Sequence, residues 1–330
     1  ILGGPTQGTW TWSFSTNDGP GQTQTVTITA TDSDGASANA TFNLVVNNVA
    51  PTATFSNGGA VNEGSTGSVS FAAQADASSV DTTAGFHYAY DFDNNGTYES
   101  GDGTYAGSGT NASATVPASF LADGPAARVV RGRILDKDGG FTDYTTTITI
   151  NNVAPNVAPN SASVTVNEGA TATNSGTFSD PGVDTVAITA SIGTITQASG
   201  TWSWSFNTND GPDQTQTVTI TATDSDGAVS TTTFNLVVNN VAPSVGRNNA
   251  TVTVNEGATA ANTGTWSDPG LDVVTLTAST GSVVKNNDGT WSWSFGTNDG
   301  PDQTQTVTIT ATDSDGAVST TTFNLVVNNV

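Results

Sequence analysis

Acidic residues recur in short turn sequences along the chain, and their types and spacing could do chemistry. Asp-Ser-Asp-Gly stands at 32–35, 224–227 and 313–316, and Asp-Lys-Asp-Gly stands at 136–139. Glu63 and Glu168 each precede a glycine. Carboxylate and amide oxygens are hard ligands that suit Ca²⁺ and bind zinc or copper poorly. The sequence therefore predicts Ca²⁺ as a cofactor, provided that the fold gathers these turns.

The chain is a tandem array. The segment QTQTVTITATDSDGA occurs three times without a change, beginning at Gln22, Gln214 and Gln303. About one further, divergent repeat fits between the first and second copies. Repeats of this length have the size of a small independent β-domain. We predict four repeats: a partial first repeat at 1–48, a second at 49–153, a third at 154–241 and a fourth at 242–330.

The elements that must position the turns are short strands. In the third repeat, apolar residues alternate with Thr, Ser or Asn at a period of two, which is typical of half-buried strands. The alternating segments are 163–166, 185–188, 202–206, 215–221 and 231–238. Asp-Gly and Glu-Gly turns separate them. The pattern predicts an all-β fold: a tandem array of antiparallel immunoglobulin-like β-sandwich domains.

Composition narrows the class of partner. The chain has 29 acidic and 6 basic residues, a formal net charge of −23, and no cysteine. Nucleic acid and anionic membranes are disfavoured as partners, because both are bound through Lys and Arg. Divalent cations are favoured, and no segment is long and apolar enough to span a membrane. We expect an extracellular segment of a longer, secreted polypeptide that contains no disulfide.

The second repeat carries FHYAYDFDNNGTYESGDG from Phe86 and RGRILDKDGG from Arg131. At these residues the chain resembles the polycystic-kidney-disease (PKD) family of immunoglobulin-like domains. The other repeats resemble bacterial immunoglobulin-like and cadherin-like repeats of large surface proteins and adhesins. The resemblance implies a structural and adhesive role, with calcium between consecutive domains as at a cadherin junction.

Loops at the two ends of each sandwich place the acidic residues. We call the end where the chain enters a repeat its N-terminal pole and the end where it leaves its C-terminal pole. Alternate loops of such a sandwich meet at opposite poles. The predicted calcium ligands where the second repeat meets the third are Glu63, Asn152, Asp180, Asp224 and Asp226. Those where the third meets the fourth are Glu168, Asn240, Asp268, Asp313 and Asp315, with Asp210 or Asp213 as further candidates. Asp136 and Asp138 are the corresponding pair in the second repeat.

The second repeat also holds an internal candidate. Asp91, Asp93 and Asn95 reproduce the spacing of a calcium-binding loop, with Glu99 as a later acidic ligand. Asn95-Gly96 is equally a common tight-hairpin signal. An ion site and a plain turn both stay open here. The Asp-Gly and Glu-Gly turns have the same alternative interpretation, in which they only form soluble turns on an acidic surface and bind no ion.

Tryptophan pairs carry the alternative function. Trp202 and Trp204 share one face of a strand, as do Trp291 and Trp293. In a domain with few other large apolar residues such a stripe favours a core position. Exposed rings would instead form a sugar-stacking platform, as in the carbohydrate-binding accessory modules of a secreted polysaccharide-degrading enzyme.

The chain lacks the parts of an active site. His87 is the only histidine and lies among aromatic residues in a strand pattern, so it favours a packed or surface position over a catalytic base. We predict a non-catalytic, calcium-stiffened stalk or fibre-forming region of a bacterial-type surface protein or adhesin. Its expected partners are copies of itself, other cell-surface proteins or glycans.

Overall fold

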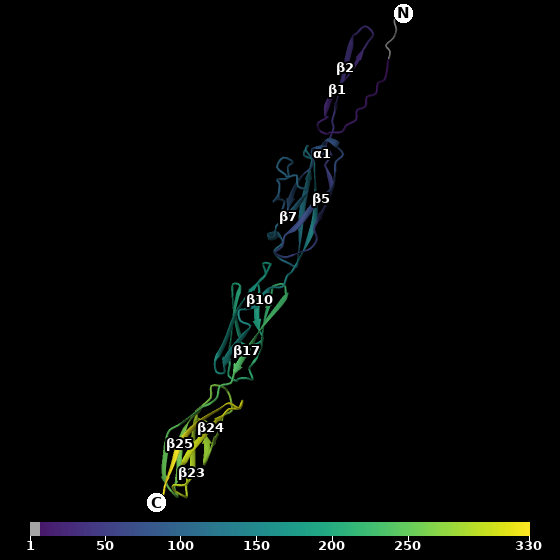
Figure 1. The fold of residues 1–330 in the computed structure, drawn as a ribbon. Coiled ribbons are helices and arrows are strands. Elements are labelled where there is room, and N and C mark those ends of the chain that lie inside the picture. The colour runs from purple at the N-terminus through teal and green to yellow at the C-terminus, as the bar shows by residue number, and fades with distance from the viewer. Residues whose placement is uncertain (1–6) are drawn as a thin grey trace. The chain divides into compact units, whose positions relative to one another are not determined.

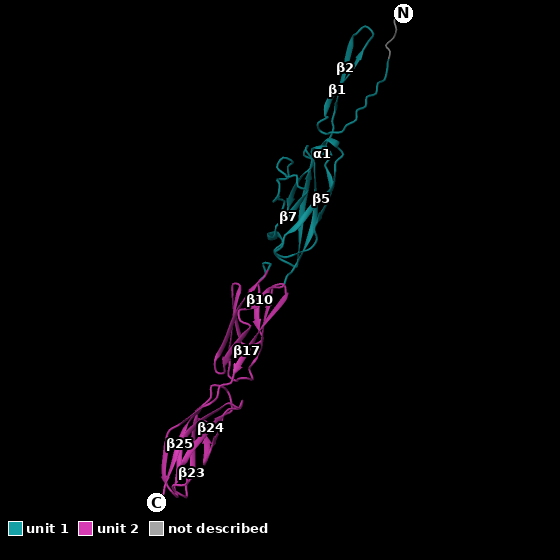
Figure 2. Cartoon of the chain, viewed as in Figure 1, with its two compact units in different colours: residues 1–153, 181–184 teal, residues 154–180, 185–330 magenta. Residues whose placement is uncertain are grey.

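The computed structural model describes residues 7–330, which form 25 strands, one short α-helix and one 3₁₀-helix (Figure 1). Two compact units divide the chain (Figure 2). Compact unit 1 comprises the chain up to Val153 together with Pro181–Asp184, and compact unit 2 comprises Ala154–Asp180 and Thr185–Val330. Among the described residues, no helix has the length and apolar character needed to cross a bilayer.

The first repeat contributes a two-stranded hairpin, β1 (Gln24–Thr31) with β2 (Ser37–Leu44). Trp12 stacks on Phe14, with ring centroids 5.9 Å apart, and meets Phe42 edge to face at 5.3 Å. All three rings are more than one-third exposed. This small aromatic group therefore covers only part of its own apolar surface.

The second repeat is a sandwich of a three-stranded and a four-stranded sheet. The first sheet has the order β3 (Thr52–Asn57), β5 (Gly67–Ala75), β7 (Ser113–Val116). The second has the order β4 (Val61–Asn62), β9 (Phe141–Asn151), β8 (Ala126–Leu135), β6 (His87–Asp91). The helix α1 (Ser79–Ala84) and the 3₁₀-helix η1 (Ala118–Phe120) lie in the connections. Apolar residues from both sheets form one core, including Val69, Phe71, Tyr90, Ile134 and Ile148.

The third repeat packs two four-stranded sheets. One has the order β10 (Asn156–Pro159), β12 (Thr171–Ser179), β15 (Thr201–Asn207), β14 (Thr194–Ala198). The other has the order β11 (Ser163–Asn167), β17 (Val229–Asn239), β16 (Gln216–Thr223), β13 (Ala187–Ala190).

The fourth repeat repeats this strand order. Its sheets are β18 (Ser244–Arg247), β20 (Thr259–Ser267), β23 (Thr290–Gly296), β22 (Ser282–Lys285) and β19 (Thr251–Asn255), β25 (Val318–Asn328), β24 (Gln305–Thr312), β21 (Thr275–Ala278). The predicted all-β fold of tandem sandwiches is confirmed.

One pairing differs from a purely antiparallel sandwich. β11 runs parallel to β17, and β19 runs parallel to β25. In the second repeat, β4 pairs in parallel with β9. The reason is topological: an early strand of each repeat joins the edge of the sheet that contains the last strand, and both strands run from the N-terminal to the C-terminal pole.

The tryptophan stripes of the third and fourth repeats are core, as the favoured interpretation predicted. Trp202, Trp204, Trp291 and Trp293 are at most 1% exposed. Trp204 meets Phe234 edge to face at 4.9 Å between centroids, and Trp293 meets Phe323 in the same way. The indole Nε1 of Trp204 donates a hydrogen bond to the carbonyl oxygen of Ile192 (2.7 Å). These rings are not available as a sugar-stacking platform.

His87 lies in β6, where its ring stacks on Tyr105 with centroids 3.8 Å apart. Its Nδ1 atom lies within hydrogen-bonding distance of the Tyr105 carbonyl oxygen. His87 is therefore packed against an aromatic ring, which is one of the two positions expected for it.

Candidate metal centres at the repeat ends

Each Asp-x-Asp-Gly turn uses one carboxylate oxygen of its first aspartate to hold the turn. Oδ1 of Asp313 accepts from the backbone N–H of Ala317 at 2.7 Å. Oδ1 of Asp136 accepts from the N–H groups of Asp138 (2.9 Å) and Gly140 (2.8 Å). Asp224 makes the corresponding bond to Ala228 at 2.8 Å. The turn-forming interpretation therefore accounts for Oδ1 of these residues but not for Oδ2 of Asp313 and Asp136.

The linker asparagines reach the remaining oxygens. The side-chain amide of Asn240 donates to Oδ2 of Asp313 at 3.2 Å, while the amide oxygen of Asn240 is buried without a hydrogen-bond partner. The amide of Asn48 donates to both carboxylate oxygens of Asp136, at 3.1 and 3.0 Å. The Asn-Asn-Val-Ala-Pro linkers are thus tied to the hairpin of the repeat that follows them.

The glutamates hold the linkers from the other side. Glu168 is 3% exposed, and its Oε2 and Oε1 accept from the backbone N–H groups of Gly211 (2.9 Å) and Val241 (2.8 Å). Glu63 makes the corresponding bonds to Gly124 (2.9 Å) and Val153 (2.7 Å). This structural role was not predicted from the sequence. A carboxylate oxygen has a second lone pair, so the same atoms can still ligate an ion.

Glu168 lies beside two aspartates of the loop after β20. Ligand atoms of Glu168, Asp268 and Asp272 lie within 4.8 Å of one another, and we call these residues the Glu168 cluster. Oδ2 of Asp268 and Oδ2 of Asp272 are buried without a hydrogen-bond donor. The backbone N–H of Leu271, in the same loop, donates to the carbonyl oxygen of Asn209 at 2.6 Å, which joins this loop to the C-terminal pole of the third repeat.

The electrostatics of these residues are those of uncompensated negative charge. Burial is the largest cause of the raised pKa of Glu168. The two backbone hydrogen bonds oppose this shift, and the neighbouring charges of Asp272 and Asp268 add to it. Burial is also the largest cause of the raised pKa of Asp268, to which Asp272 and Asp313 contribute. Asp210 and Asp315 have raised pKa values for the same two reasons, burial and nearby carboxylates. A divalent cation would relieve this repulsion.

Asp272 was missed in the sequence. The signal for it is the spacing Asp-Pro-Gly-x-Asp, which occurs at both 180–184 and 268–272. In compact unit 1, ligand atoms of Asp184, Glu63 and Asp123 lie within 4.8 Å of one another, so the second member of this pattern gathers with a glutamate in both places. Asn152 belongs to compact unit 1, and Asp180, Asp224 and Asp226 belong to compact unit 2. The calcium site predicted from these four residues and Glu63 stays a prediction.

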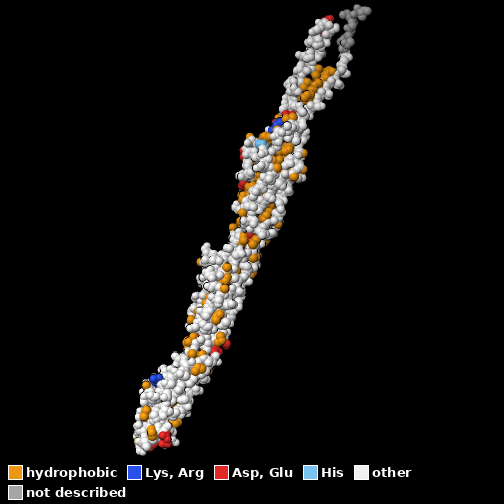
Figure 3. All heavy atoms as spheres, viewed as in Figure 1, with side chains coloured by type: hydrophobic (Ala, Val, Ile, Leu, Met, Phe, Trp, Pro, Cys, Tyr) orange, Lys and Arg blue, Asp and Glu red, His pale blue; other side chains and the backbone are white. Residues whose placement is uncertain are grey.

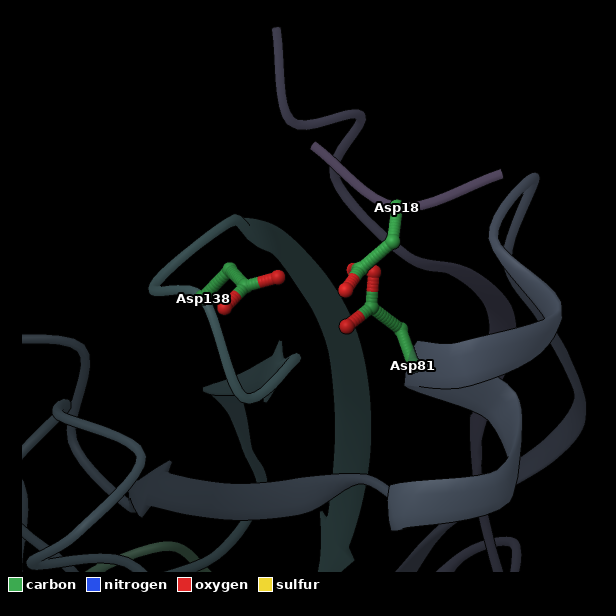
Figure 4. Close-up of side chains that lie close together, drawn as sticks. All are labelled: Asp18, Asp81 and Asp138. Atoms are coloured by element: carbon green, nitrogen blue, oxygen red, sulfur yellow. The ribbon is translucent and has the colours of Figure 1, made fainter. Parts of the chain in front are cut away.

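The N-terminal pole of the second repeat gathers more acidic residues than Asp136 and Asp138. Ligand atoms of Asp76, Asp81 and Asp136 lie within 4.8 Å of one another, and so do those of Asp18, Asp81 and Asp138. Asp81 is fully buried at the start of α1, and neither of its carboxylate oxygens accepts a hydrogen bond. Figure 4 shows Asp18 and Asp81 facing each other, with Asp138 across from them on the hairpin.

A lysine lies among the carboxylates of Asp18, Asp81 and Asp138. Nζ of Lys137 lies 3.0 Å from Asp18, 3.2 Å from Asp81 and 2.6 Å from Asp138. Hydrogen bonds to Asp138 and then Asp18 raise the pKa of Lys137, so the ammonium is firmly charged. Neither this lysine nor Asp76 and Asp81 were singled out from the sequence.

The internal loop of the second repeat is held by its own backbone. Oδ1 and Oδ2 of Asp91 accept from the N–H groups of Asn95 (3.1 Å) and Gly96 (2.9 Å), and the guanidinium of Arg131 lies 3.5 Å from Asp91. Ligand atoms of Asp91, Asp93 and Glu99 lie within 4.8 Å of one another. The turn interpretation accounts for both hydrogen bonds of Asp91, Arg131 supplies its counter-charge, and an ion at this loop stays a prediction.

Family comparison agrees with the strand order. Residues 240–326 match the model of the bacterial Ig domain family. The chain is built of tandem Ig-like repeats. This match does not distinguish PKD-like from cadherin-like repeats, so those two assignments stay predictions. No curated protein sequence matches the chain.

Several solved structures are similar to the chain at low identity. The titin I-band fragment I67–I69 is 12% identical, with a TM-score of 0.40, over 85% of this chain and 99% of that one. The immunoglobulin domains 1–5 of Sidekick-1 are 14% identical, with a TM-score of 0.38, over 96% and 68%. An endo-fucoidan hydrolase, MfFcnA4, is 16% identical, with a TM-score of 0.30, over 66% and 35%.

Proposed function

We propose that this chain is a structural, non-catalytic segment of an extracellular surface protein, and that Ca²⁺ stiffens the junctions between its repeats. The observation that carries the proposal is the Glu168 cluster. It combines a buried glutamate that holds the linker with two aspartates whose Oδ2 atoms are buried without a hydrogen-bond donor. Desolvated carboxylates without donors are costly unless a cation compensates them.

Calcium fits this donor set better than other metals. The cluster and the neighbouring Asn240 and Asp313 offer carboxylate and amide oxygens from both the third and the fourth repeat. Ca²⁺ takes six to eight oxygen ligands in a flexible geometry, whereas zinc and copper prefer nitrogen or sulfur. The chain has no cysteine and one histidine, which is distant in sequence from these residues.

The effect of the ion would be mechanical. Extracellular calcium modules bind with a Kd of about 10⁻⁴ to 10⁻³ M, so millimolar calcium would fill the sites and a chelator would empty them. An emptied junction would leave Glu168, Asp268 and Asp272 to repel one another across the Asn239–Pro243 linker. The chain would then bend at its junctions.

Small-angle X-ray scattering of the 330-residue chain tests this proposal. We expect a narrow distribution of longest dimensions in millimolar calcium and a broad distribution after chelation. The variant Asp272→Asn should need a higher calcium concentration to reach the narrow distribution. Asp302 is an exposed aspartate at the C-terminal pole of the fourth repeat, and Asp302→Asn should need the same concentration as the wild-type chain. Superimposable scattering curves with and without calcium would sink the proposal.

Self-association remains part of this proposal. β14 and β22 are free edges of their sheets in the third and fourth repeats, and an open edge can pair with a strand of another chain. Sedimentation velocity at increasing protein concentration tests it, and a strictly monomeric chain would count against fibre formation through these edges. The carbohydrate-binding alternative lacks its platform in these two repeats, because their tryptophan pairs are buried.

A further inference from the structure

The junction between the first and second repeats, here called the first junction, and the junction between the third and fourth repeats contain aligned acidic residues. The copies of QTQTVTITATDSDGA align Asp18 with Asp210, and the hairpins align Asp138 with Asp315. In both junctions a linker asparagine donates its amide to the first aspartate of the next hairpin: Asn48 to Asp136, and Asn240 to Asp313. The first junction lies within compact unit 1 and the other within compact unit 2.

The two junctions differ in charge at two aligned positions, and both differences change the charge in the same direction. Lys137 stands where the fourth repeat has Ser314, and Gly21 stands where the third repeat has Asp213. At these two positions the first junction is therefore less negative by two charges.

The first junction shows where a cation sits. The ammonium of Lys137 bridges Asp18, on the first repeat, with Asp81 and Asp138 on the second. Figure 4 shows the three carboxylates that it joins. Asp81 is fully buried and accepts no hydrogen bond, so the ion pair with Lys137 supplies its counter-charge. A lysine ammonium is a compact point charge with three donors.

At the other junction the aligned carboxylates have no such partner. Ser314 lacks a charge, and its hydroxyl donates to Oδ1 of Asp272 at 2.6 Å. Oδ2 of Asp272 stays buried without a donor. The backbone N–H of Leu271 donates to the carbonyl oxygen of Asn209 at 2.6 Å. Together with the bond from Ser314 to Asp272, this contact brings together the three loops that carry Asp210 and Asp213, Asp272, and Asp315.

We infer that the ammonium of Lys137 occupies a cation position that, where the third repeat meets the fourth, belongs to a divalent ion held by Asp210, Asp213, Asp272 and Asp315. This outer ion would be distinct from the one expected in the Glu168 cluster, although both touch Asp272. The first junction carries its cation as part of the chain, so this position is filled at any calcium concentration. The inference rests on the proposed function, because it divides calcium-dependent from calcium-independent positions.

Counting bound ions tests the inference. Equilibrium dialysis of the full chain against saturating calcium gives the number of ions bound, and lysine is exchanged at the aligned serine. Ser314→Lys should bind one ion fewer than the wild-type chain. Ser33→Lys, in the aligned turn of the first repeat, makes the same charge change on an exposed hairpin and should bind the same number as wild type.

The reciprocal variant guards against a misfolded Ser314→Lys. Lys137→Ser combined with Gly21→Asp should bind one ion more than wild type and should become sensitive to chelator at the first junction. A wild-type chain that binds no calcium would overturn the proposed function. A wild-type chain that binds calcium, with unchanged ion counts in both the folded Ser314→Lys chain and the double variant, would overturn this inference alone.

Discussion

Single carboxylates in this chain have two tasks at once. Oδ1 of Asp313 accepts a hydrogen bond that closes its own hairpin, and Oδ2 accepts one from the side-chain amide of the linker residue Asn240. Glu168 accepts hydrogen bonds from two backbone N–H groups, one of them in the linker. Such residues stabilise the fold even without an ion. Asp272 is different, because one of its oxygens takes a serine hydroxyl and the other takes no donor.

The effect of replacing Asp272 on stability should therefore have opposite signs with and without calcium. Without the ion, Asp272→Asn removes repulsion from Glu168 and Asp268, and we expect the chain to be more stable by a few tenths of a kcal/mol to about 1 kcal/mol. With calcium, the loss of one charged ligand should weaken binding about tenfold or more and make the variant less stable than wild type. Thermal unfolding in both conditions measures the two differences.

The control for this charge change is Asp302→Asn, which removes an exposed carboxylate away from the Glu168 cluster. It should shift the unfolding temperature equally with and without calcium. If Asp272→Asn destabilises the chain by the same amount in both conditions, Asp272 is only a structural residue.

The raised pKa values of Glu168 and Asp268 give a pH dependence with a definite sign. For an acid whose pKa is raised by folding, the stabilising contribution is full below its unfolded pKa, about 4, and is lost as the pH rises through the folded pKa. The ion-free cluster should therefore weaken the fold above that point. Protons and calcium compete for the same oxygens.

The calcium-induced rise in unfolding temperature should accordingly be small near pH 4 and increase toward neutral pH. Protein freed of ions by dialysis is the reference, because chelators bind calcium poorly in acid. A calcium effect that is constant across this range would contradict a site built from these carboxylates.

At the scale of single elements, close packing of strands against indole rings fixes small residues in β12 and β20. A Cβ atom on Gly264 would overlap the carbonyl oxygen of Gly246 and lie 2.5 Å from ring atoms of Trp291. Gly176 has the same relation to Trp202 in the third repeat. The core positions of Trp202 and Trp291 therefore depend on a glycine in the paired strand.

Gly264→Ala should destabilise the fourth repeat by about 1–3 kcal/mol, because the methyl group forces the indole or the backbone to move. Chemical unfolding followed by tryptophan fluorescence measures the loss. Gly296→Ala is the matched control, since a Cβ atom there meets nothing within 4 Å. Equal stability of the two variants would mean that the core yields easily at Gly264.

The elements that the sequence predicts well are those whose signal is local. Alternation at a period of two located β11, β15 and β17 to within about two residues, and the scarcity of other large apolar side chains correctly indicated that Trp202 and Trp204 are core. β10, β12 and β14 were missed, because these strands carry few large apolar residues.

The candidate sites were harder to predict, because their members meet only after folding. Asp272 lies in a loop and Asp81 in the short helix α1, and neither belongs to an Asp-x-Asp-Gly turn. Lys137 has the sequence signal of an ordinary surface residue of a hairpin. Their roles depend on which loop of the neighbouring repeat lies opposite. Comparison of aligned positions between repeats, such as Lys137 with Ser314, was the signal available in the sequence.

At the scale of the whole molecule, removal of calcium should expose the linkers unequally. We expect cleavage at the Asn239–Pro243 linker to increase after chelation, because the carboxylates on either side repel one another. The Asn47–Pro51 linker should respond less, because Lys137 still bridges Asp18 and Asp81. Limited digestion with a protease that needs no calcium, read by mass spectrometry, identifies the cut sites. Equal acceleration at both linkers would contradict a lysine-held junction.

The parallel pairing of an early strand with the last strand has a consequence for a chain under tension. Force that arrives through the two linkers of a repeat pulls β19 and β25 in opposite directions along their common ladder, so the rungs from Thr251↔Asn324 to Asn255↔Asn328 are loaded in shear together. In the second repeat the parallel ladder has only the rungs Val61↔Ile150 and Asn62↔Asn151. When such a tether is stretched, its second repeat would then unfold before the third and fourth, and the added length would lower the force on those two repeats.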